Sequence, residues 1–286
     1  MLTLLLSMFI FGSVGVVRRL IPLPSSVLAC FRGACGALLL FVVAKAQRKK
    51  LRSGIGIHKT LLLLLSGALI GFNWILLFEA YRFTTVATAT LCYYMAPTIV
   101  VALSPLMFRE RITLRKGLCA LVSVLGMVFV SGILEGGALS LADLRGVLLA
   151  LGAAALYAAV VILNKKLPGI DAYAKTILQL LSAAVALVPY LLITRPAIEI
   201  ALTPGIVALL LLIGFVHTGV AYALYFGSID HLSAQTVAIF SYLDPITALV
   251  LSALVLHEPM TVLGLVGAVL IIGAAILGEL SPPSEV

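Results

Sequence analysis

The sequence is poor in charged residues. Only 10% of its 286 residues are Asp, Glu, Lys or Arg, whereas 63% are hydrophobic. About a quarter of the residues in a typical water-soluble protein are charged. The shortage argues against a water-soluble globular domain and predicts a chain that folds in lipid.

Motifs for catalysis and metal binding are also missing. The sequence has no GxxxxGK[ST] phosphate loop, no HExxH zinc motif and no GxSxG nucleophile motif. Its four cysteines, Cys30, Cys35, Cys92 and Cys119, lack the spacing of metal ligands. We therefore expect no enzymatic activity, no cofactor, no metal site and no use of ATP.

Long apolar segments are abundant instead. A bilayer core of about 30 Å requires about 20 residues of helix, and ten such segments follow one another. The first lacks the basic start and cleavage site of a signal peptide, so we interpret it as a spanning helix. The predicted spans are 2–17, 24–44, 60–81, 85–107, 113–132, 145–163, 172–193, 205–226, 233–255 and 260–278. The predicted fold class is an all-α membrane protein with ten transmembrane helices.

Basic residues are unevenly distributed along the chain. If the N-terminus and every second loop lie on one side of the membrane, that side carries 13 Lys and Arg residues and the other carries 5. Short cytoplasmic loops are rich in these residues, so both termini are predicted to be cytoplasmic in an inner (plasma) membrane. The net charge of +8 then reflects topology and not nucleic-acid binding. The expected partners are the lipid bilayer, a small-molecule substrate and, as a candidate coupling ion, the proton, for a monomer or weak homo-oligomer.

An internal repeat divides the chain. A shift of 148 positions aligns residues 71–113 with 219–261 at 11 identities in 43. The predicted halves are 1–133 and 145–280, with a connecting loop at 134–144 and a tail at 281–286. Because each half has five helices, an odd number, the second half must cross the membrane in the opposite sense. Such inverted repeats are common in secondary transporters.

One motif occurs in both halves. Tyr94-Met-Ala-Pro97 is followed thirteen residues after its proline by Glu110, and Tyr242-Leu-Asp-Pro245 is followed at the same interval by Glu258. The pattern resembles the EamA repeat of the drug/metabolite transporter superfamily, and the resemblance extends over the ten-helix plan. It implies a central cavity lined by helices 1, 3, 4, 6, 8 and 9, and transport of small organic metabolites, often amino acids and often outward.

Polar and aromatic residues gather on these helices. Stacking and cation–π contacts would suit an aromatic or cationic substrate, although helix packing or an interfacial belt is the alternative for any single aromatic. Asp244 would pair with a substrate ammonium group or take up a proton, or else cap carbonyls freed by a kink at Pro245. The candidate substrate-binding residues are Asn73, Trp74, Tyr94, Tyr157, Tyr222, Tyr242 and Asp244.

A second group consists of candidates for coupling or gating: Arg32, Glu79, His217, Pro97 and Pro245. Arg32 would bind a substrate carboxylate or make a structural pair. Glu79 is spaced to pair with Arg82, and His217 would carry protons or simply make buried hydrogen bonds. The two prolines predict that their helices kink or loosen, either to shape the central cavity or as a purely structural bend.

The leading hypothesis is a secondary-active exporter of amino acids or related metabolites that works by alternating access. An uptake permease for a small cationic or aromatic metabolite is one alternative. A membrane-embedded enzyme acting on lipid-linked substrates is another, from a different class. A channel is disfavoured, because channels usually repeat their pore-lining element about an axis along the membrane normal.

Overall fold

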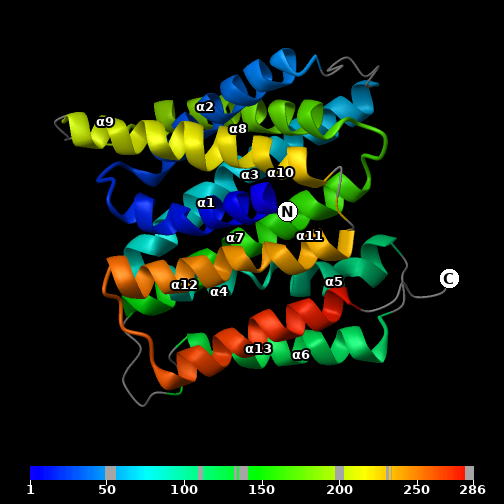
Figure 1. Ribbon diagram of the computed structural model, residues 1–286, viewed down its shortest axis with the longest axis vertical. Helices are drawn as coiled ribbons and strands as arrows, with labels where there is room; N and C mark the ends of the chain where they lie inside the picture. Colours follow the sequence, from blue (N-terminus) through cyan, green and yellow to red (C-terminus); the bar gives the residue numbers. More distant parts are fainter. Residues whose placement is uncertain are drawn as a thin grey trace.

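The protein is built from helices in its computed structural model, which describes residues 1–48, 56–108, 112–131, 134, 141–196, 203–229, 232 and 234–280. These residues contain no β-strand (Figure 1). The helices are α1 (Leu2–Arg19), α2 (Ser25–Ala46), α3 (Ile57–Phe83), α4 (Val86–Tyr93), α5 (Ala96–Phe108), α6 (Leu114–Val130), α7 (Leu141–Lys165), α8 (Ala172–Thr194), α9 (Pro204–Leu211), the π-helix η1 (Leu212–Val220), α10 (Ala221–Ile229), α11 (Ala234–Ser241), α12 (Leu243–Val255) and α13 (Val262–Glu279).

The outer faces of the bundle are apolar. Large side chains such as Leu192, Leu254 and Val269 are exposed by 68%, 68% and 71%. Within the described residues, seven helical segments are long and apolar enough to cross a membrane, and α12 and α13 are shorter apolar helices. Helices satisfy their backbone hydrogen bonds internally, so such surfaces suit lipid. The predicted class, an all-α multi-pass membrane protein, is confirmed.

Three predicted spans are divided in the structure. The span at 85–107 contains α4 and α5, the span at 233–255 contains α11 and α12, and the span at 205–226 contains α9, η1 and α10. The prediction that the helices kink or loosen at the prolines agrees with these interruptions, which lie just before Pro97 and Pro245. Pro97 and Pro245 lie in the first turns of α5 and α12, where a missing N–H costs no helical hydrogen bond.

Equivalent helices of the two halves pack antiparallel. Between α2 and α8, the Cys30 thiol contacts the Ala184 carbonyl at 3.5 Å, while a Cβ built at Gly36 would meet the Leu180 side chain. Residue numbers therefore increase along α2 in the direction in which they decrease along α8, so the two helices are antiparallel. Figure 1 shows α2 and α8 at one edge of the bundle and α6 and α13 side by side at the other.

The second equivalent pair, α6 and α13, meets through glycines. A Cβ built at Gly126 would lie 2.8 Å from the carbonyl oxygen of Gly267. A Cβ built at Gly278 would lie 3.9 Å from Cys119, so this pair is antiparallel as well. Two equivalent pairs running in opposite directions are the structural signature of inverted halves.

Exchange of the halves also preserves the packing of the central helices. The third span of the first half, α3, packs on α7 and α8 of the second half. Its equivalent in the second half, formed by η1 and α10, packs on α1 of the first half, and η1 also packs on α2. Likewise α1 packs on α12, while α7 packs on α4 and α5. The centre of the bundle is therefore formed by the first, third and fourth spans of each half.

Candidate functional site

A cluster of tyrosines contributed by both halves occupies the centre of the bundle. The ring centroids of Tyr93 and Tyr157 lie 5.6 Å apart, and those of Tyr94 and Tyr242 lie 6.3 Å apart. Tyr93 and Tyr94 stand where α4 ends, Tyr157 lies on α7, and Tyr242 lies between α11 and α12. The helix breaks thus bring Tyr94 and Tyr242, which are equivalent in the repeat, against each other.

Open space adjoins this cluster. Tyr157 is 41% exposed. Tyr94, Tyr222 and Asp244 are half-buried. The four predicted residues thus retain accessible surface where the resemblance to the EamA repeat implies the central cavity.

Tyr222 links the cavity to the first helix. Its ring centroid lies 5.2 Å from that of Phe11 on α1 and 5.9 Å from that of Phe226 on α10. Aromatic faces and edges are therefore presented by α1, α4, α7 and α10. Such a lining binds apolar or cationic groups well and anions poorly unless a positive charge is close by.

Asp244 provides the negative charge. It lies in the first turn of α12, where the helix dipole favours a carboxylate, and its side chain is a hydrogen-bonding partner of Tyr94. The helix is held tightly here: a Cβ added at Gly12 of α1 would collide with the Asp244 carbonyl oxygen. The backbone of Asp244 is thus fixed between two helices while its carboxyl group faces the cavity tyrosine.

Arg32 provides the positive charge. It is 5% exposed, its guanidinium carbon lies 4.4 Å from the ring centroid of Trp74, and its Nε donates to Thr218 Oγ1 at 2.8 Å. Its Nη2 donates to the carbonyl of His217 at 3.4 Å. Among the described residues, no ion pair joins Arg32 to a carboxylate, and its Nη1 makes no hydrogen bond. A buried guanidinium held only by dipoles and an aromatic face favours an incoming anion.

The π-helix η1 orients the partners of Arg32. Thr218 Oγ1 donates to the carbonyl of Ile213, five residues earlier, and His217 Nδ1 lies 3.2 Å from the carbonyl of Leu212. A carbonyl only accepts, so Nδ1 carries a proton. His217 Nε2 contacts Ser13 Oγ at 2.9 Å. The histidine thereby ties η1 to α1, and π-helical turns are frequent at functional sites.

Asn73 joins two helices and is also a hydrogen-bonding partner of Tyr93 in the tyrosine cluster. It is 1% exposed and its Nδ2 donates to the carbonyl of Ala153 at 2.6 Å, which joins α3 to α7. Its neighbour Trp74 is 6% exposed and touches Arg32. Asn73 thus reaches the tyrosine cluster, whereas Trp74 is buried against Arg32.

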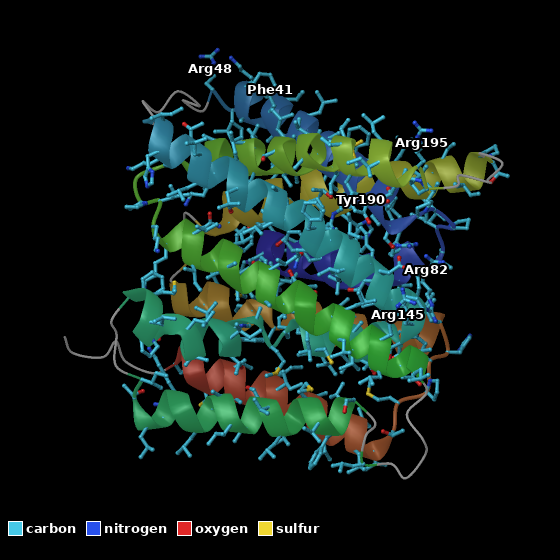
Figure 2. All side chains as sticks on the ribbon, turned by 180° about the vertical axis from the view of Figure 1, so that it is seen from behind. Phe41, Arg48, Arg82, Arg145, Tyr190 and Arg195 are labelled. Carbon is cyan, nitrogen blue, oxygen red and sulfur yellow. The ribbon has the colours of Figure 1, made fainter. Side chains whose placement is uncertain are left out.

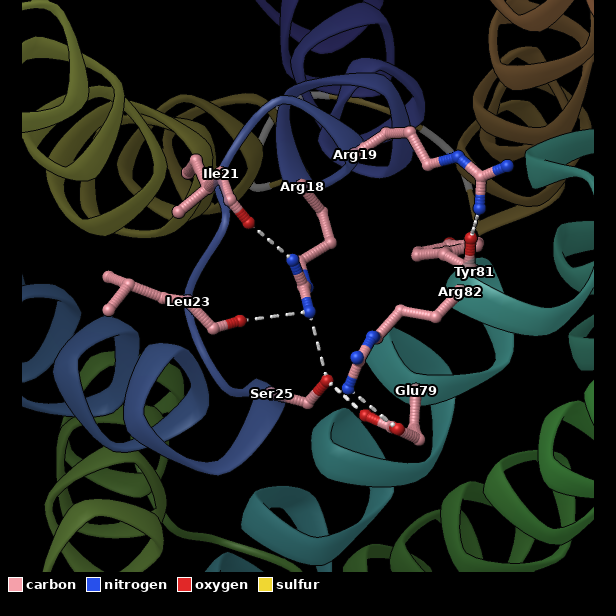
Figure 3. A network of polar contacts seen from close by, with 8 residues as sticks. All are labelled: Arg18, Arg19, Ile21, Leu23, Ser25, Glu79, Tyr81 and Arg82. Atoms are coloured by element: carbon pink, nitrogen blue, oxygen red, sulfur yellow. Dashed lines mark hydrogen bonds and ion pairs between the residues drawn. The ribbon is translucent and has the colours of Figure 1, made fainter. Parts of the chain in front are cut away.

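Glu79 lies away from the cavity, at the end of the bundle where α1 ends and α2 begins. Its Oε1 accepts from Arg82 Nη1 at 3.0 Å, so the expected pair is present, and its Oε2 accepts from Ser25 Oγ at 2.7 Å. Figure 3 shows Arg18 reaching the same serine. Sequence reasoning does not identify Arg18 and Ser25 as members of this group. By its position in the chain Arg18 counts as a loop residue, and only the folded chain brings it to α3.

Glu258 joins three helices at the same end. Its Oε2 accepts from the backbone N–H of Val86 at 2.7 Å and from Ser252 Oγ, and its Oε1 lies 3.6 Å from Arg19. Arg19 also donates to the carbonyl of Tyr81 (Figure 3). The start of α4 and the ends of α1 and α12 are therefore fastened together. Glu110, the matching residue of the first half, lies outside the described residues.

Comparison with known proteins identifies related chains. The sequence model described as the EamA-like transporter family matches residues 1–132 and 144–278. A protein of Bacillus subtilis (strain 168), described as uncharacterized transporter YxxF, is 30% identical over 243 residues, which cover 84% of this chain and 76% of the relative. A solved crystal structure superposes with a TM-score of 0.66 at 15% identity and covers 97% of this chain and 96% of that one. The structural match supports the fold alone.

Proposed function

Because the chain belongs to the EamA-like transporter family of the drug/metabolite transporter superfamily, we propose that it is a secondary-active exporter of amino acids or related small zwitterions. Membership of this family indicates the general activity, which is transport across a membrane. The substrate class rests on the charges of the central cavity.

The observation that carries this proposal is the pairing of opposite charges around the tyrosine cluster. Arg32 lies over the ring of Trp74, and Asp244 is a hydrogen-bonding partner of Tyr94. An α-amino acid carries a carboxylate and an ammonium group on the same carbon atom. The free Nη1 of Arg32 suits the carboxylate, whereas Asp244 and the faces of Tyr94 and Tyr157 suit the ammonium group.

Alternating access follows from the inverted halves. Two conformations related by exchange of the halves open the same cavity to opposite sides. The Glu258 contacts fasten α1, α4 and α12 together at the end where α1 ends. Positive-inside counting assigns this end to the outside of a plasma membrane, with both termini in the cytoplasm.

The substrate test compares an amino acid with its deaminated analogue. Binding to purified protein in detergent is measured as a rise in apparent melting temperature, because a ligand that binds only the native state stabilises it by mass action. A panel of amino acids, amines, nucleosides and cations first selects a ligand. We then expect Asp244→Asn to weaken binding of the amino acid about tenfold or more and to leave binding of the deaminated acid nearly unchanged.

Matched variants locate the effect. Tyr94→Phe, which removes the hydroxyl beside Asp244, is expected to weaken amino-acid binding, while Tyr190→Phe, whose ring contacts Phe72 at 5.8 Å, is expected to bind as the parent does. Equal weakening of both ligands by Asp244→Asn would refute the assigned role of the carboxylate. A hit confined to amines or nucleosides would favour the alternative substrate classes.

Proton coupling is the second element of the proposal. A carboxyl group that exchanges a proton during the cycle gives transport a pH dependence, and an amide cannot do so. In proteoliposomes with an imposed pH gradient, we expect Asp244→Asn to abolish gradient-driven accumulation while retaining exchange of labelled substrate. Unchanged gradient-driven transport in this variant would remove Asp244 from the coupling step.

A further inference from the structure

A second cavity lies outside the central one, at the end of the bundle where α1 ends. Its volume is about 550 Å³. Arg18, Arg19 and Arg82 line it together with Phe78, Tyr81 and the turn 21–24. None of the proposed substrate-binding residues lines this space. Figure 2 shows that Arg82, Arg145 and Arg195 all lie toward this end of the molecule.

The charges around this cavity do not balance. Arg19 has Glu258 as its counter-ion, at 3.6 Å. The two remaining arginines, Arg18 and Arg82, share the carboxylate of Glu79, and Arg18 reaches it only through the hydroxyl of Ser25 (Figure 3). The lining therefore carries one positive charge more than its partner carboxylates neutralise.

Arg18 is held in place by neutral acceptors. Its Nη1 donates to the carbonyl of Ile21 at 2.7 Å, and its Nη2 donates to the carbonyl of Leu23 at 3.2 Å and to Ser25 Oγ at 3.0 Å. These dipoles fix the guanidinium without cancelling its charge. The side chain is 4% exposed, and its Nε is buried with no hydrogen-bond partner among the described residues. A fixed, desolvated and unneutralised guanidinium is a preorganised receptor for an anion.

The ring of Phe78 connects the two cavities. The guanidinium carbon of Arg18 lies 5.9 Å from its centroid, and that of Arg32 in the central site lies 5.7 Å from it. Phe78 is fully buried. One aromatic side chain thus stands next to the cations of both sites.

We propose that this outer cavity is a separate binding site for the carboxylate of a small organic anion, held by Arg18 and Arg82 in competition with Glu79. The site does not depend on amino-acid transport. A carboxylate bound there displaces Glu79 from Arg82 and supplies the missing negative charge. Removal of Glu79 therefore strengthens binding, and removal of Arg82 weakens it.

The test measures binding of radiolabelled malonate to purified protein by equilibrium dialysis, at constant ionic strength. We expect Glu79→Gln to bind about tenfold more tightly than the parent and Arg82→Gln about tenfold more weakly, from the usual strength of hydrogen bonds to charged groups. Because the Arg82 side chain is 58% exposed, its replacement leaves the fold intact. Opposite shifts in two neighbouring variants are not expected from a purely structural role.

The control is Arg145→Gln. Arg145 lies at the same end of the molecule but stacks on Phe83, with 4.2 Å between its guanidinium carbon and the ring centroid, and it does not line the outer cavity. We expect this variant to bind malonate as the parent does. Equal affinities for the parent, Glu79→Gln and Arg82→Gln would overturn the proposal and assign any malonate binding to Arg32.

A lipid headgroup could supply the same anionic chemistry, so the measurement is repeated in lipid nanodiscs. Malonate binding that is equal in phosphatidylcholine discs and in discs that also contain phosphatidylglycerol supports a soluble anion as the ligand. Loss of malonate binding only in the phosphatidylglycerol discs would contradict that assignment, because the headgroup would then be the occupant.

Discussion

At the scale of single residues, Glu258 has two separable roles. Its Oε2 caps the start of α4 through the Val86 N–H, and its charge attracts Arg19. The first contact is a hydrogen bond to a backbone group, whereas the second is partly exposed, with the Arg19 side chain 37% accessible. Exposed ion pairs contribute little to stability, and unsatisfied backbone donors are costly.

We therefore predict different effects for two substitutions at Glu258. Glu258→Ala leaves the Val86 N–H without its acceptor and destabilises the protein by about 1–3 kcal/mol. Glu258→Gln keeps an acceptor oxygen and costs about 1 kcal/mol or less. Thermal unfolding in detergent measures both. Equal losses in the two variants would show that the charge, and not the cap, is what stabilises this end.

The sequence singles out candidate residues for the central site, but it does not show which contacts each of them makes. Tyr94, Tyr157, Tyr222 and Asp244 are singled out by the sequence, because aromatic and acidic residues are unusual enough inside apolar helices to stand out. Asn73 stands out for the same reason, and its side chain both joins α3 to α7 and makes a hydrogen bond with Tyr93. Composition marks a polar residue but does not tell which neighbour satisfies it.

At the scale of helices, the glycine contact between α6 and α13 sets how closely the two equivalent helices approach. Gly267 has its neighbour Gly126 almost in backbone contact, whereas a Cβ added at Gly273, further along α13, would have nothing within 4 Å. The same substitution at the two glycines therefore tests packing alone, since both lie inside one helix.

We predict that Gly267→Leu forces α6 and α13 apart and destabilises the protein by about 1–3 kcal/mol, the usual cost of overpacking. Gly273→Leu, facing open space, is expected to be nearly neutral or slightly stabilising, because leucine favours a helix more than glycine does. The comparison is made by thermal unfolding in detergent. A larger loss at Gly273 than at Gly267 would contradict this packing.

Helix breaks are the least predictable elements. Hydropathy finds a continuous apolar run at 85–107 and at 233–255, but α4 ends at Tyr93 and α11 at Ser241. Pro97 and Pro245 indicate some disturbance near these points. The π-helix η1 leaves no comparable signal, because its residues Leu212–Val220 are as apolar as an ordinary spanning helix. Its geometry depends on contacts with α1 and α2 made far away in sequence.

At the scale of the whole molecule, an even number of spans brings both termini to one side. We predict that in intact cells a membrane-impermeant thiol reagent labels Arg195→Cys, after α8, but not Gln47→Cys, after α2. Both positions are exposed in the structure, so accessibility differs only through the membrane.

Permeabilised cells provide the control for this experiment, since both variants should then be labelled. The reverse pattern in intact cells would invert the proposed orientation. The native cysteines are buried or half-buried and are replaced by alanine as a precaution.

The contact between Arg32 and Trp74 has an optical consequence. Trp74 is the single tryptophan of the chain, and the guanidinium of Arg32 lies 4.4 Å from its ring centroid. Indole fluorescence responds to the charge beside it, so the emission of the whole protein reports on one place. A carboxylate that binds Arg32 should shift this emission, while an anion confined to the outer cavity should leave it nearly unchanged. Unlabelled protein in a fluorimeter thus distinguishes the two sites by itself.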